Sequence, residues 1–421
     1  MKSYDEIINK NRAPYWESLE RELGVETVDA LKEMYTLYTS EMIDWFASLY
    51  DVEIGGYYYS ESARDNEGFL PDAESTVQAL GFWRDSGLCA EVGGYAQGVP
   101  EWIGEDICRF ISSLQDPDGY FYHPQWGKDI TLSRRGRDLN WSRNILSAFG
   151  RSPKYPTIID KKSDAEQTET LIPEHLSSAE KFNEYLISLN LGEFSYHKGS
   201  ELSSQLSQIK ACGLEKQLIE FLNGLQHPDT GLWHNEKNYY GVNGLMKLSG
   251  IYLSSGLPLP NAMNAAMSAA DAIVSDEPVT SIVSLWNTWV ALSRVCSVLR
   301  SQGGEVGNEQ ADAILSVMRK RAAECIRVSY KKLLPFRKSG SSFSYNPKKS
   351  APFSQGAPAA VKDTPEGDVN ATVIGSSLML NSIYSALGVP SELRVPMFFE
   401  EDRIRYVDLL NKKRENAKFD N

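Results

Sequence analysis

The sequence from Leu225 to His234 reads LQHPDTGLWH, and it decides the fold because the same kind of turn recurs along the chain. A second copy, LQDPDGYFYH, runs from Leu114 to His123, and a third, LYDVEIGGYYYS, from Leu49 to Ser60. Two looser copies are GEFSYH at Gly192 to His197 and GSSFSY at Gly340 to Tyr345. Each copy places glycine or serine in a tight turn immediately before aromatic side chains, which indicates an internal repeat.

The spacing of these turns gives the length of the repeat. Gly55 and Gly119 are 64 residues apart, and Gly231 and Gly340 follow at intervals of 112 and 109 residues, close to twice that length. A unit of roughly 55 to 65 residues holds two helices and their loops. Roughly six such units would fill most of the chain.

Apolar residues recur with helical periodicity between the turns, as in VDALKEMYTLYTSEMIDWFASLY at 28–50 and SIVSLWNTWVALSRVCSVLRS at 281–301. Alternation typical of strands occurs only in short stretches. The sequence therefore predicts an all-α fold, in which about six helical hairpins close into an α/α toroid. We expect one domain over residues 1–421, with long polar loops near 51–75, 120–145, 150–178 and 337–370.

Composition excludes several classes of function. The 421 residues carry a net charge of −13, which disfavours binding to nucleic acid. No continuous apolar run is long enough for a membrane span, and the N-terminus has no apolar signal region, so we expect a cytoplasmic protein without a membrane partner. Five scattered cysteines and the absence of dinucleotide, P-loop, zincin and hydrolase-elbow motifs predict no metal and no cofactor.

The turn from Gln226 to Trp233 resembles the Gln…Gly-x-Trp turn of the terpenoid cyclase and protein prenyltransferase superfamily, and Gln115 to Phe121 is a degenerate copy. The resemblance implies an α/α toroid in which the glutamine and the aromatic residue tie one helix end to the next. The Asp-x-Asp-Asp and Asp-Asp-x-x-Asp motifs of those cyclases are absent. The resemblance of the turn keeps an isoprenoid-binding or isoprenoid-cyclising toroid as an alternative function. Glycoside hydrolases and polysaccharide lyases share the same ring shape and are the other candidates.

The loop GGYYYSESARDNEGFLPDAE at 55–74 combines aromatic and acidic side chains, as sugar-binding sites do. Tyr57 and Tyr58 are candidate substrate-binding residues, and Asp65 and Glu67 are candidate catalytic carboxylates. Asp72 has a second interpretation as the N-cap of the helix that follows.

A second cluster, HPQWGKDITLSRRGRDLNWSRN at 123–144, holds four arginines in an acidic protein and predicts an anion-binding site. Trp126, Arg134, Arg137, Asn140 and Trp141 are its candidate substrate-binding residues. The alternative is that the arginines pair with neighbouring carboxylates.

A third cluster follows the best repeat turn and contains His234, Tyr239 and Tyr240. It is similar to the arrangement in toroidal polysaccharide lyases, which pair an asparagine that neutralises a uronate with a histidine or tyrosine that removes the C5 proton. The resemblance implies Asn140 as the neutraliser, His234 as the base and Tyr240 as the acid, and Tyr239 is a candidate substrate-binding residue.

The fourth cluster, near the C-terminus, contains Gln355, Glu366, Asp368 and Asn370 in a stretch rich in glycine, proline and serine. Asp368 or Asn370 could cap the next helix. Glycoside hydrolysis needs two carboxylates, and a closed ring would make the first and last repeats neighbours. We therefore predict Glu366 and Asp368 as catalytic partners of the acidic 55–74 loop, with Gln355 and Asn370 binding substrate.

Together these clusters predict an enzyme that cleaves glycosidic bonds of an oligosaccharide, with acidic groups on the substrate. Hydrolysis by a carboxylate pair is favoured over elimination by asparagine, histidine and tyrosine, because several carboxylates lie in loops of adjacent repeats. A scaffold that binds glycans or peptides without catalysis is the remaining alternative.

Overall fold

The computed structural model describes residues 4–160 and 171–419 and confirms the all-α class. Within those residues, the strands are four two-residue segments in two antiparallel pairs. β1 (Tyr50–Asp51) pairs with β2 (Gly56–Tyr57), and β3 (Phe353–Ser354) pairs with β4 (Ala357–Pro358). One cluster of buried apolar side chains extends along the chain from Ile8 to Leu410.

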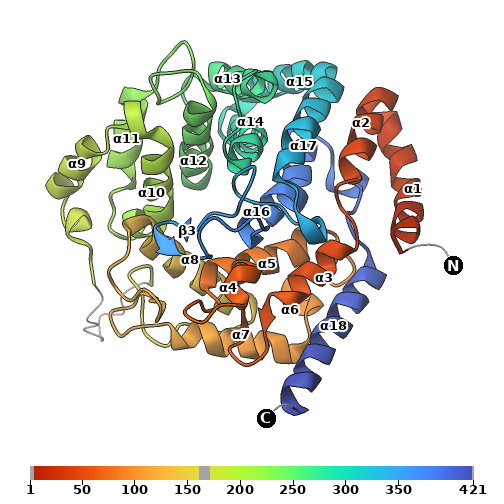
Figure 1. The fold of residues 1–421 in the computed structure, drawn as a ribbon. Coiled ribbons are helices and arrows are strands. Elements are labelled where there is room, and N and C mark those ends of the chain that lie inside the picture. Colours follow the sequence, from red (N-terminus) through yellow and green to blue (C-terminus); the bar gives the residue numbers. More distant parts are fainter. Residues whose placement is uncertain (1–3, 161–170, 420–421) are drawn as a thin grey trace.

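Six helical segments, the central helices, contact one another in chain order, and the last contacts the first, so the contacts form a closed cycle (Figure 1). They are α5 (Ala73–Asp85), α8 (Leu132–Ala148), α10 (Leu191–Ala211), α12 (Tyr239–Ser255), α14 (Ile282–Gln302) and a sixth segment that joins α16 (Val369–Val373), the π-helical η4 (Ile374–Leu378) and α17 (Met379–Ala386). The cycle closes because α16 packs on α5.

A second set of helices packs on the outside of the central helices, and Figure 1 shows α9, α11, α13 and α15 at the periphery. This set consists of α3 (Glu41–Ser48), α7 (Glu101–Ser113), α9 (Ala179–Ser188), α11 (Glu215–Leu225), α13 (Ala262–Val274) and α15 (Gly304–Leu333). The terminal helices are α1 (Tyr4–Leu23), α2 (Val25–Tyr35), which packs on α15, and α18 (Glu400–Phe419), which packs on α3.

Short helical turns complete the chain. They are α4 (Glu61–Arg64), α6 (Tyr95–Gly98), η1 (Glu174–Leu176), η2 (Leu334–Phe336), η3 (Ser339–Ser341) and η5 (Ser391–Leu393). Most of them lie in the long connections between the peripheral and central helices, where the chain has to change direction.

The repeated turns are small hairpins with a structural duty. Tyr50 faces Tyr57, Gln115 faces Phe121 and Arg337 faces Phe343 across their turns. In the best copy, the buried Gln226 side chain donates to the Gly231 carbonyl at 2.8 Å, and the Trp233 indole donates to the Leu222 carbonyl of α11 at 2.8 Å. Glutamine and aromatic residue thus tie the end of one helix to the turn.

Two of the turn glycines, Gly55 and Gly231, dock on the next peripheral helix without room for a side chain. A Cβ at Gly231 would collide with the Ala265 backbone of α13, and a Cβ at Gly55 would lie 2.5 Å from the Asp106 carbonyl of α7. Gly231 also has a φ of +65°, which a residue with a side chain adopts only with strain. In the last copy, Gly340 lies against Trp45 of α3, so this turn joins the end of the chain to its beginning.

One expectation about the elements needs correction. The stretch 120–145 is not a loop throughout, because α8 begins at Leu132, after Thr131 caps it by accepting the Arg134 N–H. Two of its arginines, Arg134 and Arg137, pair with carboxylates of α8 itself and of the start of α5. By length and composition alone, α14 could cross a membrane. However, 78% of its most apolar stretch is buried inside the protein, as is typical of a core helix.

We predict that Gly231→Ala lowers the free energy of unfolding by the cost of left-handed backbone, about 1–2 kcal/mol, plus about 1–3 kcal/mol for the clash with α13. Gly213→Ala is the matched control, because Gly213 has a φ of +73° but open space at its Cβ position. Urea denaturation of both variants separates the two costs. Equal losses would mean that the docking contact contributes nothing.

Candidate functional site

The N-terminal turns of the central helices lie together. Asp72, Thr131, Asn238 and Asp368 cap α5, α8, α12 and α16, and each side chain accepts a backbone N–H of its own helix. Helix N-termini carry partial positive charge, so an end of the molecule where several begin favours anionic ligands. Hydrogen bonds join the N-terminal halves of neighbouring helices, namely Gln78 to Asn370 (3.4 Å), Arg134 to Asp72 (3.1 Å), Arg137 to Ser200 (2.9 Å) and Asn243 to Ser284 (3.2 Å).

Arg134 is a buried structural residue and not a free anion-binding group. Its guanidinium is 1% exposed and pairs with Asp72 at 3.1 Å, Glu74 at 3.0 Å and Asp138 at 2.9 Å. Burial raises the pKa of Asp138 to about 6, against the lowering effect of Arg134. The pairing alternative therefore holds for this arginine, which locks α8 to α5.

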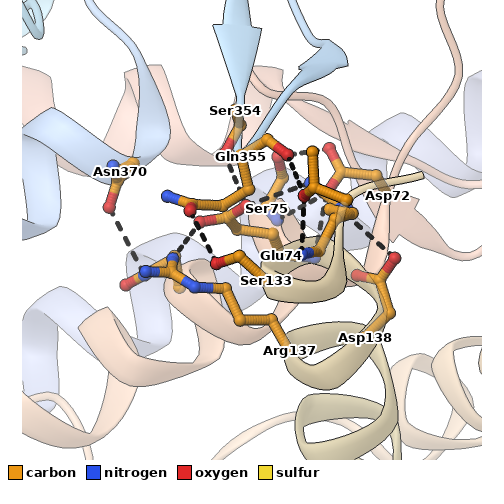
Figure 2. Close-up of polar contacts among 12 residues, drawn as sticks. Asp72, Glu74, Ser75, Ser133, Arg137, Asp138, Ser354, Gln355 and Asn370 are labelled. Carbon is orange, nitrogen blue, oxygen red and sulfur yellow. Dashed lines mark hydrogen bonds and ion pairs between the residues drawn. The ribbon is translucent and has the colours of Figure 1, made fainter. Parts of the chain in front are cut away.

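Arg137, one helical turn further along α8, is placed differently. It is partly accessible, donates to Glu74 at 3.3 Å and to Ser200 at 2.9 Å, and lies over the Trp141 ring at 5.3 Å. Figure 2 shows the Arg137 head beside Glu74, with Gln355 and Asn370 on the same side. Arg137 and Trp141 thus remain candidates for binding an acidic ring-containing ligand.

Gln355 and Asn370 approach this group from the C-terminal part of the chain. Gln355, in the turn between β3 and β4, accepts from the Ser133 hydroxyl at 3.0 Å, and Asn370, in the first turn of α16, accepts from Gln78 at 3.4 Å. Ser354 donates to Glu74 at 2.5 Å and anchors the hairpin over α5 and α8 (Figure 2). Both predicted residues are partly accessible amides beside Arg137.

Aromatic and imidazole rings gather beside this group at the starts of α10 and α12. The Tyr240 ring lies 5.1 Å from His234, 5.6 Å from His197 and 5.9 Å from Tyr196, measured between ring centres. His234 Nδ1 and the Tyr240 hydroxyl are buried and have no hydrogen-bond partner in the part of the chain described. Burial also raises the pKa of Tyr240, so its hydroxyl keeps its proton at neutral pH.

Tyr196 connects the two groups. Its ring contacts Tyr240 on one side, and the Lys247 ammonium lies 5.8 Å from the ring centre. Burial raises the pKa of Tyr196, Tyr345 adds to this, and the charge of Arg137 acts in the opposite direction. Tyr196 and Tyr345 therefore both lie near Arg137, between the cationic group and the imidazoles.

The two carboxylates predicted in the last repeat have structural partners. Glu366 is 7% exposed and accepts from the Ser62 N–H at 2.7 Å and the Ser62 hydroxyl at 2.5 Å. The sequence predicted a free carboxylate here, and the structure instead shows a bonded one. Asp368 is fully buried and caps α16, accepting from the N–H groups of Ala371 and Tyr345, each at 2.8 Å. Both residues join loop ends across the closure of the chain.

The two carboxylates predicted in the first repeat lie on the surface. Asp65 ends α4 and pairs with the neighbouring Arg64 at 2.6 Å, with its side chain 58% exposed. Glu67 is exposed in the following turn. Within the described residues, neither side chain pairs with the arginines of α8 that bind Asp72 and Glu74.

Asn140 does not serve as a neutralising group. Its amide donates to the Ser204 carbonyl at 3.0 Å and accepts from the Ser207 hydroxyl at 2.7 Å, so both functions hold α8 against α10. This prediction fails because an asparagine on a helix flank facing another helix satisfies its polar atoms there.

The predicted aromatic residues of the repeat turns are mostly core. Tyr57 is fully buried and bonds the Tyr406 hydroxyl at 3.2 Å, and Tyr239, 3% exposed, accepts from Lys332 at 2.8 Å. Tyr58 donates to Asp51 at 2.8 Å within its own hairpin. Large aromatic surfaces in a docked turn are stabilising when buried, which explains their positions.

Trp126 covers the Arg134 network. Its ring stacks on His123 at 4.0 Å between centres and lies 4.7 Å from the Arg134 guanidinium. It is partly accessible, and it shields the ion pairs from water. Its contacts support the buried arginine and do not by themselves define a ligand position.

Sequence reasoning missed Glu74, Gln78, Tyr196, His197 and Lys247 as parts of this site. Tyr196 had a usable signal, because it occupies the same place in the copy GEFSYH as Tyr345 in GSSFSY, and the two side chains approach each other. Lys247 had none, since it lies inside an apolar helix. Residues 4–160 and 171–419 contain no group of three or more His, Cys, Asp or Glu side chains able to hold a metal ion.

Comparisons with protein-family models, with curated proteins and with solved structures found no match for this chain. The assignment of a function therefore depends on the chemistry of the side chains that meet at the helix N-termini.

We predict that Arg134→Met lowers the free energy of unfolding by about 3–5 kcal/mol, because the buried Asp72 and Asp138 lose their counterion and Glu74 keeps only Arg137. Arg135→Met on the same helix is the control. Arg135 only lies over the Tyr120 ring, so its loss should stay within about 1 kcal/mol. Equal stability of the two variants in denaturant titrations would show that the network does not hold α8 to α5.

We predict that Asp368 makes stability fall as pH rises. Burial raises its pKa from 3.8 to about 7, so between these values the folded state holds a proton that the unfolded state has released. The contribution of the Asp368 proton to the free energy of unfolding is therefore complete below the pKa that Asp368 has in the unfolded chain. It is lost as the pH rises through the pKa that Asp368 has in the folded protein.

The measurement is the melting temperature at about pH 5 and about pH 8. Asp368→Asn, whose amide oxygen can still cap α16, should show a smaller fall than the wild type, while Asp65→Asn should follow the wild type. Parallel profiles for wild type and Asp368→Asn would contradict the assignment.

Proposed function

We propose that the chain is an α/α toroid that cleaves an acidic oligosaccharide by elimination, at the end where the central helices begin. The toroid is supported by the closed cycle of contacts from α5 through α14 to α16 and back to α5. It is also supported by the repeated turns, the last of which docks through Gly340 on α3. Peripheral helices would then form the outer layer of the ring.

The chemistry of the helix N-termini supports an acidic sugar as the ligand. Arg137 offers a partly accessible guanidinium, and Trp141 and Tyr196 offer ring faces next to it. Gln355 and Asn370 add amides that can bond sugar hydroxyls. A cationic centre between aromatic faces and amides suits a uronate better than an apolar isoprenoid, which needs a greasy cavity.

One observation carries the choice of elimination: His234 Nδ1 and the Tyr240 hydroxyl are buried, close to each other, and have no partner among the described residues. In this proposal His234 removes the C5 proton of the uronate, the electron pair forms a C4–C5 double bond, and the C4–O bond breaks. Tyr240, whose raised pKa keeps it protonated, gives a proton to the leaving oxygen. Arg137 stabilises the charge that develops on the carboxylate.

Hydrolysis has less support from the same geometry. A hydrolase needs one carboxylic acid and one free carboxylate facing the bond. Glu366 and Asp368 instead accept backbone and hydroxyl donors, and Asp65 pairs with Arg64.

We predict that the purified protein releases new reducing ends from oligogalacturonate together with the ultraviolet absorbance of an unsaturated uronate. His234→Ala and Tyr240→Phe should each lower kcat by about 10²- to 10⁴-fold, as expected for loss of a proton-transfer group. The exposed His227→Ala is the control for His234, and Glu366→Gln should keep the activity.

Each other outcome has a definite meaning. Reducing ends without absorbance, lost in Glu366→Gln, would show hydrolysis and reject the elimination. No cleavage of neutral or acidic oligosaccharides would reject the proposed enzyme activity altogether.

A further inference from the structure

Lys247 lies on α12 among the central helices and has no counterion. Its Cβ packs so close to α10 that a Cβ at Gly199 would lie 3.2 Å away, and its ammonium faces the Tyr196 ring at 5.8 Å. Among residues 4–160 and 171–419, no carboxylate forms an ion pair with Lys247 and no acceptor bonds its ammonium. The side chain is nevertheless partly accessible, so its surroundings are open to a small molecule.

Two arginines, Arg137 and Arg294, lie close enough to Lys247 to affect its pKa. Arg294 on α14 donates to the Met246 carbonyl at 2.5 Å and has no carboxylate partner within the described ranges. Burial lowers the pKa of Lys247 well below its usual value, and the charges of Arg137 and Arg294 lower it further. The three basic side chains come from α8, α12 and α14, and Arg294 bonds the carbonyl of Met246, the residue before Lys247.

The one carboxylate that acts on Lys247 is already occupied. Glu74 raises the pKa of Lys247, but its oxygens accept from Arg134 at 3.0 Å, Arg137 at 3.3 Å and Ser354 at 2.5 Å. It cannot at the same time neutralise an ammonium on α12. Among the described residues, Lys247 and Arg294 therefore have no carboxylate of their own, and the surroundings of Lys247 favour its neutral amine until an anion binds.

Two arginines of the neighbouring α8 have carboxylate partners, whereas the buried Arg12 donates to the Met397 carbonyl and to Asn9. Arg134 has three carboxylates, and Arg143, which is partly buried, pairs with Asp160 at 2.7 Å. An ammonium removed from water without a partner is destabilising. Groups that destabilise the folded state concentrate at functional sites, where a ligand completes their interactions.

We propose that Lys247, together with Arg137 and Arg294, binds the carboxylate of the ligand, which then acts as the missing counterion. The Tyr196 ring beside the ammonium would take a face of the same sugar. This inference rests on the proposed function, because it assigns the acidic group of that substrate to a subsite. It also differs from the arrangement expected from the sequence, where Asn140 holds the carboxylate.

The test compares binding of trigalacturonate with binding of its methyl ester, which keeps the skeleton and removes the charges. Isothermal titration calorimetry at one ionic strength should give the wild type a preference of about tenfold or more for the acid. Lys247→Met should reduce that preference to about threefold or less, and the exposed Lys216→Met should leave it unchanged.

The melting temperature of the ligand-free variants gives a second readout. Lys247→Met replaces a desolvated amine, which has no acceptor among the described residues, with an apolar side chain of similar length and should raise the melting temperature, whereas loss of a lysine with a purely structural role would lower it. An unchanged acid preference in folded Lys247→Met, or no acid preference in the wild type, would overturn the inference.

Failure of the proposed function looks different. If the wild type prefers the acid, Lys247→Met loses the preference and no cleavage occurs, the anion subsite stands and the elimination is rejected. If acidic substrate is cleaved and Lys247→Met keeps the wild-type KM, the elimination stands and the subsite is rejected.

Discussion

The docking of the turn glycines on the peripheral helices is the constraint on which the rest of the structure depends. At Gly55 and Gly231 the backbone of the turn touches the backbone of α7 and α13, so that no side chain could be added. Such contacts fix how closely each turn approaches the peripheral helix on which it docks, because protein interiors have little free volume. Gly340 repeats the contact against α3, which links the last repeat to the first.

This spacing brings the starts of the central helices together, with consequences for charge. Capping side chains satisfy the first N–H groups of α5, α8, α12 and α16. Side chains one to four turns further along these helices then point at one another instead of at solvent. Polar residues in that position either pair across helices, as Arg134 does with three carboxylates, or remain available to a ligand, as we propose for Lys247.

The distinction between paired and unpaired cations carries the functional argument. Arg134 and Arg137 are three residues apart on one helix, yet the first is 1% exposed and fully paired, while the second is partly accessible beside an aromatic ring. Paired buried charges stabilise an interface between helices only when each partner is satisfied. A buried basic side chain without a carboxylate partner lowers the stability of the fold, and in our proposal an anionic ligand supplies that partner. An arginine can therefore hold two helices together or bind a ligand, depending on its neighbours.

The sequence by itself determined the all-α class and the repeated turns, and it offered Asp72 and either Asp368 or Asn370 as helix caps, of which Asp72 and Asp368 do cap helices. These features follow from local signals: helical periodicity, turn chemistry and capping act over a few residues.

Only the tertiary structure decided which charged groups are neutralised. Glu366 meets Ser62, Asn140 meets Ser204 and Ser207, and Lys247 meets no carboxylate among the described residues, and each outcome depends on partners on other helices or in distant loops. The physical reason is that the energy of a charge inside a protein is set by burial and by the nearest opposite charge in space. Neither quantity can be read from neighbours in the sequence.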